Sequence, residues 1–309
     1  MSKTEKYTEI KKLLTEHFDT MSKVICKKLS ETTCSSKQFE QDISNYLLGN
    51  SKQIRSCLIF LFSKNLDIKI DDEIIKLAAA VEIIHNATLI HDDIIDEANE
   101  RRGQKTLNLK YGNKLAVISG DFLLTLALNI LIELPPQIMK NFSTCLQNLV
   151  KGEINQYFAQ NKTPSINEYI EKSKCKTASL FLAATKSLAD LRCPQYTTIL
   201  DSFAMNFGIA FQIRDDLKNF KSTDNKPVLN DLYSGIYTAP VIYAFGEEKN
   251  LSKISTNEIL EKTNTKEVLN KTNILLNQYI NNAIKQLNYL PQNHYSVAMK
   301  TLCKMLESD

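Results

Sequence analysis

Two long stretches, residues 73–96 and 112–134, are apolar on almost every side of a helix, and they constrain the fold more than any other feature. A helix on a protein surface carries a single apolar stripe, whereas a helix that is apolar all round has to be buried among other elements. Pro135 and Pro136 follow the second stretch, where they would end a helix. We therefore predict that both segments are buried central helices.

The rest of the chain follows the same helical spacing. Near the N-terminus, Ile10, Leu13, Leu14 and Phe18 recur at the interval of one buried helix face. The 309 residues include only eight Gly and seven Pro, too few for the many turns of a sheet-rich fold. We predict an all-α protein with further helices over 139–160, 166–189, 196–220 and 233–245, and amphipathic surface helices between 250 and 290.

No composition break, Gly/Ser linker or fixed-period repeat divides the sequence, so a single domain over residues 1–309 is predicted. A formal charge of +3 is too small to indicate nucleic-acid binding. The seven cysteines are an odd number without a CxxC pair, which favours free thiols in a reducing compartment over zinc ligands or disulfides.

Neither a secretory signal nor a membrane-spanning segment is predicted from the sequence. The N-terminal residues "MSKTEKYTEIKK" are charged and lack the apolar segment of a secretory signal. The most apolar run, from Phe122 to Ile132, is far shorter than the ~20 residues that span a bilayer. We expect a cytoplasmic protein without stable membrane insertion.

The segment "HDDIIDEANERRG" (91–103) ends the first apolar stretch with a group of acids. On a helix, Asp92 and Asp96 share a face one turn apart, and Asp93 lies about 100° away. Their mutual repulsion favours a bound cation, and Mg²⁺ prefers such oxygen ligands, often shared with substrate phosphates. The alternative is a solvated helix end. Arg101 and Arg102 favour the first interpretation, because arginines bind the anionic oxygens of a metal–diphosphate complex.

A second acidic pair, Asp215 and Asp216, lies in "GIAFQIRDDLKNF" and is followed by Lys218, Lys221 and Lys226. It too ends an apolar helix. Facing helices of a bundle can build metal sites from inward-pointing carboxylates, so two such clusters could together hold metal ions around one diphosphate. A chance grouping of surface charges is less plausible when it has to occur twice.

Additional basic groups lie near the ends of apolar segments. Lys52 and Arg55 are three residues apart and can face the same way, while Lys176 is followed by Thr177. His85 precedes Asp92 by about two helical turns and therefore shares its face. A single histidine on an apolar face is more often a core residue than a ligand. Here the acidic side that it shares favours a contact with bound anions.

Taken together, these motifs resemble the trans-polyprenyl diphosphate synthase family. "HDDIIDEANERRG" and "GIAFQIRDDLKN" are similar to its two aspartate-rich motifs, and "GNSKQIRS", "KTASLF" and "NDLYSGIYTAP" are similar to its other conserved segments, in the family's order over about residues 45–245. The resemblance implies an all-α helical bundle around a deep central cavity, the isoprenoid synthase fold. It also implies a homodimer.

The resemblance further implies a Mg²⁺-dependent prenyltransferase. Such an enzyme condenses isopentenyl diphosphate with an allylic diphosphate, head to tail and in trans, with about two or three Mg²⁺ ions per active site. Carried over residue by residue, the metal ligands are Asp92, Asp93, Asp96, Asp215 and Asp216. The allylic diphosphate is held by Arg101, Lys176, Thr177, Gln212 and Lys226, and isopentenyl diphosphate by Lys52, Arg55, His85 and Arg102.

The sequence departs from the family pattern in its phosphate-binding segments. Asn219 replaces the last aspartate of the second motif, which removes one formal charge and is expected to lower metal affinity. The other departures, around Lys52 and Lys226, replace glycines, an arginine, a proline and a lysine and alter the loops there: Ser51, Gln53, Ser56, Asn225, Asn230 and Ile236.

Product length should depend on residues one turn before Asp92, since the growing chain is expected to run along that helix. Those residues are Ala87 and Thr88, which lack the bulky aromatic ring that blocks the cavity in short-chain members. We predict a long, octaprenyl-type product of the hexaprenyl to decaprenyl range, suited to quinone side chains. The alternative is a short farnesyl or geranylgeranyl product, with a deeper residue such as Phe122 blocking the path.

Three other functions remain open. The set His85, His91 and Asp92 loosely resembles that of metal-dependent phosphohydrolases, which do not require the paired arginines. A terpene cyclase on the same bundle would not need the basic site for isopentenyl diphosphate. A non-catalytic partner subunit of a synthase would fit the loss of charge at Asn219, but not the retention of Asp215 and Asp216.

Overall fold

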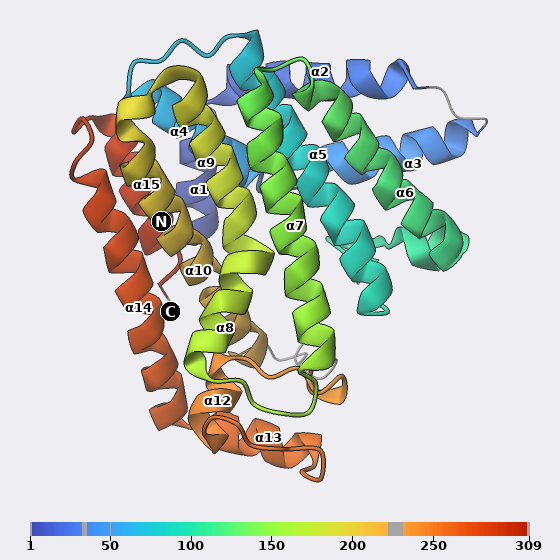
Figure 1. The fold of residues 1–309 in the computed structure, drawn as a ribbon, viewed down its shortest axis with the longest axis vertical. Helices are drawn as coiled ribbons and strands as arrows, with labels where there is room; N and C mark the ends of the chain where they lie inside the picture. The colour runs from blue at the N-terminus through green and yellow to red at the C-terminus, as the bar shows by residue number, and fades with distance from the viewer. Residues whose placement is uncertain (1, 33–35, 50, 222–230, 308–309) are drawn as a thin grey trace. The chain divides into compact units, whose positions relative to one another are not determined.

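The prediction of an all-α protein is confirmed by the computed structural model, which describes residues 2–32, 36–49, 51–221 and 231–307 (Figure 1). The helices are α1 (Lys3–Lys12), α2 (Thr15–Ser30), α3 (Lys37–Leu48), α4 (Ile54–Asn65), α5 (Asp72–Ile95), α6 (Leu107–Leu131), α7 (Pro136–Phe158), α8 (Ile166–Ser173), α9 (Ser179–Arg192), α10 (Thr197–Lys221), α12 (Ala239–Phe245), α13 (Thr256–Thr263), α14 (Lys266–Leu287) and α15 (His294–Lys304). A π-helix, η1 (Lys174–Ala178), joins α8 to α9, and a short 3-10 turn, η2 (Pro194–Tyr196), precedes α10.

The chain forms two compact units. Unit 1 comprises residues 1–141 and 184–194, and unit 2 comprises residues 142–183 and 195–309. Helices α7 and α9 each contribute residues to both units. The prediction of a single domain over the whole chain stays a prediction.

Unit 1 is built around α5, as its apolar composition predicts. This helix packs along α6 and also contacts α2 and α4 (Figure 1). By length and composition, α5 and α6 are both apolar enough to cross a membrane, but 72% of the most apolar window of α5 is already buried within the protein, against 44% for α6. Burial among neighbouring helices therefore accounts for the composition of α5 and confirms that it is a buried central helix. The same prediction is wrong for α6, which leaves part of its apolar surface exposed.

The N-terminal segment differs from the continuous helix that its spacing predicts. Helix α1 ends at Lys12, and α2 begins at Thr15 after Leu14, whose φ of −125° is not helical. The break turns the apolar face: Ile10, Leu14 and Phe18 are buried, while Leu13 is 47% exposed. Three of the four predicted core residues are thus confirmed, and Leu13 is not.

A two-residue β-hairpin that the sequence analysis did not predict follows α5. Strands β1 (Glu100–Arg101) and β2 (Gln104–Lys105) pair antiparallel across Arg102 and Gly103. Both central residues have positive φ, 53° and 76°, as the tight turns that fit the twist of a hairpin require. The hairpin therefore fixes the direction in which the side chains of Arg101 and Arg102, both predicted to bind diphosphate, leave the backbone.

In unit 2, α10 lies along α14 and packs against η1. The core contains a group of aromatic rings in which Phe207 contacts both Phe181 and Phe203 at centroid distances of 5.3 and 5.5 Å. The helix predicted over 233–245 begins only at Ala239, because Pro240 occupies its first turn, the position where a missing N–H costs nothing. The polar C-terminal helices are amphipathic, as predicted, and α14 buries Leu276, Ile280 and Leu287.

Candidate functional site

The first acidic cluster lies at the C-terminal end of α5, in unit 1. Asp93 points into the unit and is only 1% exposed, whereas Asp92 is partly exposed and Asp96, which caps the helix, is exposed. This division follows from helix geometry, because adjacent residues lie about 100° apart around the axis. Asp92 and Asp96 are therefore the carboxylates that solvent and solutes can reach.

Asp93 is held by two hydrogen bonds. Arg101 Nε donates to its Oδ1 at 2.6 Å, and the Tyr46 hydroxyl donates from α3 to its Oδ2 at 3.1 Å. Burial raises the pKa of Asp93, and the charge of Arg101 opposes that rise. A buried carboxylate is costly unless paired, so these contacts explain how an acid can occupy the interior here.

A group of cationic side chains surrounds His85 on the same helix. Burial lowers the pKa of His85 well below its ordinary value, and the charges of Arg55, Arg102 and Arg101 lower it further. The imidazole is therefore neutral at pH 7. Arg102 Nη1 also donates to Asn86 Oδ1 at 3.4 Å. Several positive charges around a neutral histidine provide an environment that favours a bound anion.

Lys52 precedes α4 in a turn that the rest of unit 1 holds in place. The Tyr7 hydroxyl donates to the Lys52 carbonyl, and Lys11 Nζ donates to Gln53 Oε1 at 3.0 Å. Gln53 adopts a left-handed φ of 52°, which non-glycine residues rarely adopt. The replacement of the family's arginine by Gln53 therefore places a neutral side chain at a conformationally strained position, where it binds Lys11.

The second acidic cluster lies on α10, in unit 2, and repeats the division seen in the first. The Asp215 side chain is 43% exposed and lies 3.3 Å from Arg214 Nη1, whereas Asp216 is 5% exposed. Asp216 accepts hydrogen bonds from the Tyr169 hydroxyl of α8 at 2.5 Å and from Gln212 Nε2 at 2.9 Å. Burial raises the pKa of Asp216 to about 6, opposed first by the charge of Lys172.

The π-helix η1 carries Lys176 and Thr177. A π-helix widens one turn of a helix and re-aims its side chains, and such turns occur frequently at functional sites. Thr177 donates its hydroxyl hydrogen to Gln212 Oε1, which joins it to the second acidic cluster. Lys176 Nζ lies 2.5 Å from Glu153 Oε1 of α7, so a bound diphosphate would share the lysine with this carboxylate.

Close packing of α10 on η1 depends on Gly208. A Cβ at this position would lie 2.5 Å from the Cα of Ala178. Alanine gains about 1 kcal/mol over glycine inside a helix, but overpacking against a backbone costs up to ~3 kcal/mol. We therefore expect Gly208→Ala to lower the free energy of unfolding by about 1–2 kcal/mol in urea denaturation and to displace Lys176 and Thr177.

Gly152→Ala is the matched control for this variant. Its Cβ would come closest to a side-chain atom, Lys176 Cγ at 2.8 Å, and would lie 3.4 Å from the nearest backbone atom, Lys176 N. It should therefore cost less stability than Gly208→Ala. Equal stability of Gly208→Ala and the wild type would show that the helices can separate at no cost.

Asp216 is expected to make the protein less stable as the pH rises. Its folded-state pKa of about 6 lies above the ordinary aspartate value of 3.8. The free-energy cost of keeping this carboxylate ionised in the folded state is therefore absent below about pH 4 and complete above about pH 6. We expect the free energy of unfolding of the wild type to fall by up to about 3 kcal/mol between pH 4 and pH 7 through this group, and Asp216→Asn to remove that part of the pH dependence, since an amide does not ionise. Urea unfolding of both proteins at both pH values without metal measures the difference; an equal pH dependence of the variant and the wild type would contradict it.

The exposed acids suit a metal that is shared with a substrate. In residues 2–32, 36–49, 51–221 and 231–307, no three His, Cys, Asp or Glu side chains are arranged as a ready-made metal cage. Mg²⁺ does not need one, because it usually binds through one or two carboxylates, water and substrate phosphates. Asp92, Asp96 and Asp215 offer hard oxygen donors of that kind, so the residues fit Mg²⁺. Metal binding by all five predicted ligands, which also include Asp93 and Asp216, stays a prediction.

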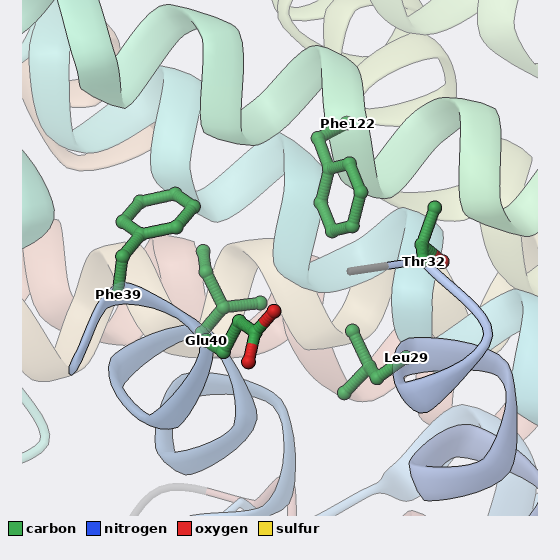
Figure 2. A pocket seen from close by; sticks show the side chains of 6 residues that line it. Leu29, Thr32, Phe39, Glu40 and Phe122 are labelled. Atoms are coloured by element: carbon green, nitrogen blue, oxygen red, sulfur yellow. The ribbon is translucent and has the colours of Figure 1, made fainter. Parts of the chain in front are cut away.

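The residues predicted to control product length lie on α5. Ala87 is fully buried and Thr88 partly so, with the Thr88 hydroxyl bonded to the His85 carbonyl at 2.8 Å. Phe122, the proposed deeper block, projects from α6 into a pocket that it forms with residues of the α2 and α3 segments (Figure 2): Leu29, Thr32, Phe39, Glu40 and Ile43. Control of product length by these residues stays a prediction.

The structure brings together several of the predicted residues within each unit. His85, Arg55, Arg101 and Arg102 interact around α5, and Thr177, Gln212 and Asp216 form one bonded group. Lys226, Asn225 and Asn230 lie outside the described residues. Four residues that contact the predicted ones were not predicted, since a tyrosine or a charged residue on an amphipathic helix carries no signal of its long-range partner: Tyr46, Tyr169, Lys172 and Glu153.

The chain is similar in sequence to known proteins. The family model for polyprenyl synthetase matches residues 37–275. The decaprenyl-diphosphate synthase of Dictyostelium discoideum is 35% identical over 274 residues, which cover 84% of this chain and 60% of that protein. A prenyl transferase of Cyanidium caldarium is 38% identical over 226 residues, which cover 70% of this chain and 69% of that protein. The match thus spans about 60–70% of these relatives' own length.

The fold has solved counterparts. A polyprenyl synthase from Caulobacter crescentus CB15, crystallised in complex with calcium and isoprenyl diphosphate, has a TM-score of 0.87 and 24% identity, covering 98% of both chains. The likeness confirms the predicted isoprenoid synthase fold.

Proposed function

This chain belongs to the polyprenyl synthetase family, and from that premise we propose that it is a trans-prenyltransferase that condenses isopentenyl diphosphate with an allylic diphosphate. The observation that carries the proposal is the group of arginines around neutral His85, beside the accessible acids Asp92 and Asp96. A terpene cyclase would not need a basic site for a second diphosphate. A phosphohydrolase would not need the paired arginines.

We propose that Lys52, Arg55, His85 and Arg102 bind isopentenyl diphosphate. This substrate keeps its diphosphate through the reaction, so binding without metal is sufficient. Neutral His85 can donate one hydrogen bond to a phosphate oxygen while the arginines supply the charge. In support of this role, burial and the neighbouring arginines hold the pKa of His85 far below neutrality. The imidazole therefore carries no positive charge that would repel these arginines.

The allylic diphosphate has to leave, and its binding residues differ accordingly. We propose that Arg101, Lys176, Thr177, Gln212 and Lys226 hold it, and that Asp92, Asp96 and Asp215 bind Mg²⁺. Bound Mg²⁺ would stabilise the negative charge that develops on the departing diphosphate. The bond from C1 of the allylic substrate to the diphosphate oxygen breaks, and diphosphate leaves. The double bond of isopentenyl diphosphate forms the new carbon–carbon bond to C1, and a proton passes from the adjacent carbon to the released diphosphate, which restores a double bond.

A long, octaprenyl-type product for quinone side chains is the finer part of the proposal. The small side chain of Ala87 and the short side chain of Thr88 support it, because neither supplies an aromatic ring one turn before Asp92. The relative from Dictyostelium discoideum carries the name decaprenyl-diphosphate synthase, which points in the same direction.

We also propose that the protein is a homodimer. Helix α6 exposes Val117 and Ile118, and the unit 2 part of α7 exposes Val150 and Ile154, each at 44–60%. Two helices with apolar residues on their outer faces favour association with a second copy. We expect Ile118→Asp to shift the protein from dimer to monomer in sedimentation, and Ile274→Asp, an exposed apolar residue on α14, to leave it unchanged. A monomeric wild type would contradict the proposal.

The test of function is incubation of the purified protein with Mg²⁺, farnesyl diphosphate and labelled isopentenyl diphosphate, followed by sizing of the extracted products. Chains of about thirty carbons or more would support a long-chain synthase. A geranylgeranyl product alone would keep the reaction and reject the long product. No product, with a control enzyme active under the same conditions, would favour a non-catalytic partner subunit.

A further inference from the structure

The second aspartate of each acidic motif receives a tyrosine hydroxyl from a neighbouring helix. In unit 1, Tyr46 donates from α3 to Asp93 Oδ2, and Arg101 donates to Oδ1 of the same carboxylate. A chain of contacts therefore runs from Tyr46 through a buried acid to Arg101. Arg101 is a residue proposed to hold the allylic diphosphate, but Tyr46 lies outside the motifs that resemble the family.

Unit 2 contains the same construction with different residues. Tyr169 donates from α8 to Asp216 Oδ2, and Gln212 donates to Oδ1. Gln212 in turn accepts the hydroxyl hydrogen of Thr177. The chain of contacts runs from Tyr169 through a buried acid to Gln212 and Thr177, two residues that are also proposed to hold the allylic diphosphate.

The two chains of contacts are independent in sequence and in structure, since they lie in different units and on different helices. We propose that Tyr46 and Tyr169 are positioning residues, each of which fixes the second aspartate of one motif and, through it, the side chains that bind the allylic diphosphate. Neither tyrosine touches the substrate in this proposal. The inference rests on the proposed function only for the identity of that substrate.

The physical reason is the orientation of a buried carboxylate. A carboxylate that is bonded on one oxygen only can rotate about its Cβ–Cγ bond, and the group on its other oxygen rotates with it. A tyrosine on the second oxygen removes that freedom. Burial raises the pKa of both tyrosines above the ordinary value, so their hydroxyls keep the proton that they donate.

Loss of either tyrosine hydroxyl should weaken the binding of the allylic substrate only. Arg101, Gln212 and Thr177 belong to the allylic set, whereas Lys52, Arg55 and His85 belong to the isopentenyl set. A hydrogen bond to a charged group contributes enough free energy that its loss weakens the dependent interaction by about tenfold. We therefore expect Tyr46→Phe and Tyr169→Phe each to raise the KM for farnesyl diphosphate by about tenfold and to leave the KM for isopentenyl diphosphate within about twofold.

Tyr111→Phe is the matched control. The Tyr111 hydroxyl donates to Asp42 Oδ2 at 2.6 Å, so the variant loses the same kind of bond, and Asp42 lies on α3 one turn before Tyr46. This bond is outside both acidic motifs. Both KM values of Tyr111→Phe should equal those of the wild type, whatever its effect on Tm.

A binding measurement tests the inference without turnover. Calorimetric titration with inorganic diphosphate, in the presence and absence of Mg²⁺, isolates the Mg²⁺-dependent affinity. Both tyrosine variants should lower that affinity by about tenfold, and Tyr111→Phe should not. A double variant adds a second test: when Arg101 is already Gln, Tyr46→Phe should change the affinity less than about twofold, because its effect passes through Arg101.

Equal changes in both KM values would assign the tyrosines a general structural role and overturn the inference, as would unchanged KM and unchanged diphosphate affinity. If Arg101→Gln does not fold, the single variants still decide through calorimetry. Failure of the proposed function is distinguishable, since the wild type would then form no product while the diphosphate titrations still compare the variants.

Discussion

Replacement of Asp92 by Ala is expected to lower kcat/KM by on the order of a thousandfold while changing Tm by only a few degrees. Asp92 is partly exposed at the end of α5 and shares a helix face with Asp96. Its proposed role is to bind Mg²⁺, which stabilises charge on the departing diphosphate. Removing an accessible carboxylate from a repelling pair costs the fold little, so activity and stability should separate.

The measurement is steady-state kinetics at several Mg²⁺ concentrations, with Tm recorded on the same samples. Asp72→Ala is the control, because the Asp72 side chain is 70% exposed at the opposite end of α5, where it forms an ion pair with Lys76. Its kcat/KM should stay within about twofold of the wild type, since exposed ion pairs contribute little. Near-normal turnover by Asp92→Ala would remove this residue from the metal site.

Replacement of Ala87 by Tyr is expected to shorten the product to about four isoprene units or fewer. Ala87 is fully buried on α5, one turn before the first motif, so a tyrosine there would fill the space proposed for the growing chain. The ring would also overpack the unit, at a cost of about 1–3 kcal/mol. Chromatography of the labelled products measures the change in length.

Ala87→Leu is the milder variant if the tyrosine prevents folding, and it should give products of intermediate length. Ala78→Leu is its matched control: Ala78 is also fully buried on α5, but nine residues earlier, which places it on the opposite side of the helix. It should lose similar stability without changing the product. An unchanged product distribution in both Ala87 variants would show that the chain grows along another path.

Much of the fold follows from local periodicity. The buried α5 and the amphipathic α14 lie where the spacing of apolar residues places them, because that spacing reports directly on which helix face is covered. Local irregularities were not predicted. The break between α1 and α2 at Leu14, and the π-helix at Lys176, interrupt apolar patterns that look continuous in the sequence.

In the candidate site too, the residue types were predicted from the sequence, but the burial of the individual side chains was not. The acidic motifs and the arginines were identified from their order and spacing, since metal and diphosphate chemistry requires those residue types. From the sequence, both members of each acidic pair are predicted metal ligands: Asp92 and Asp93, and Asp215 and Asp216. The structure separates the members of each pair, with one carboxylate accessible and the other buried against a tyrosine.

The amino-acid sequence by itself determined the all-α class, the central helix α5 and the chemistry of the two motifs, because helical periodicity and residue type act over a few neighbouring positions. Only the tertiary structure decided which aspartate of each motif is held inside. Tyr46 and Asp93 lie 47 positions apart in the chain, and so do Tyr169 and Asp216. A hydrogen bond between helices depends on how those helices pack, and no local pattern of residues specifies that partner.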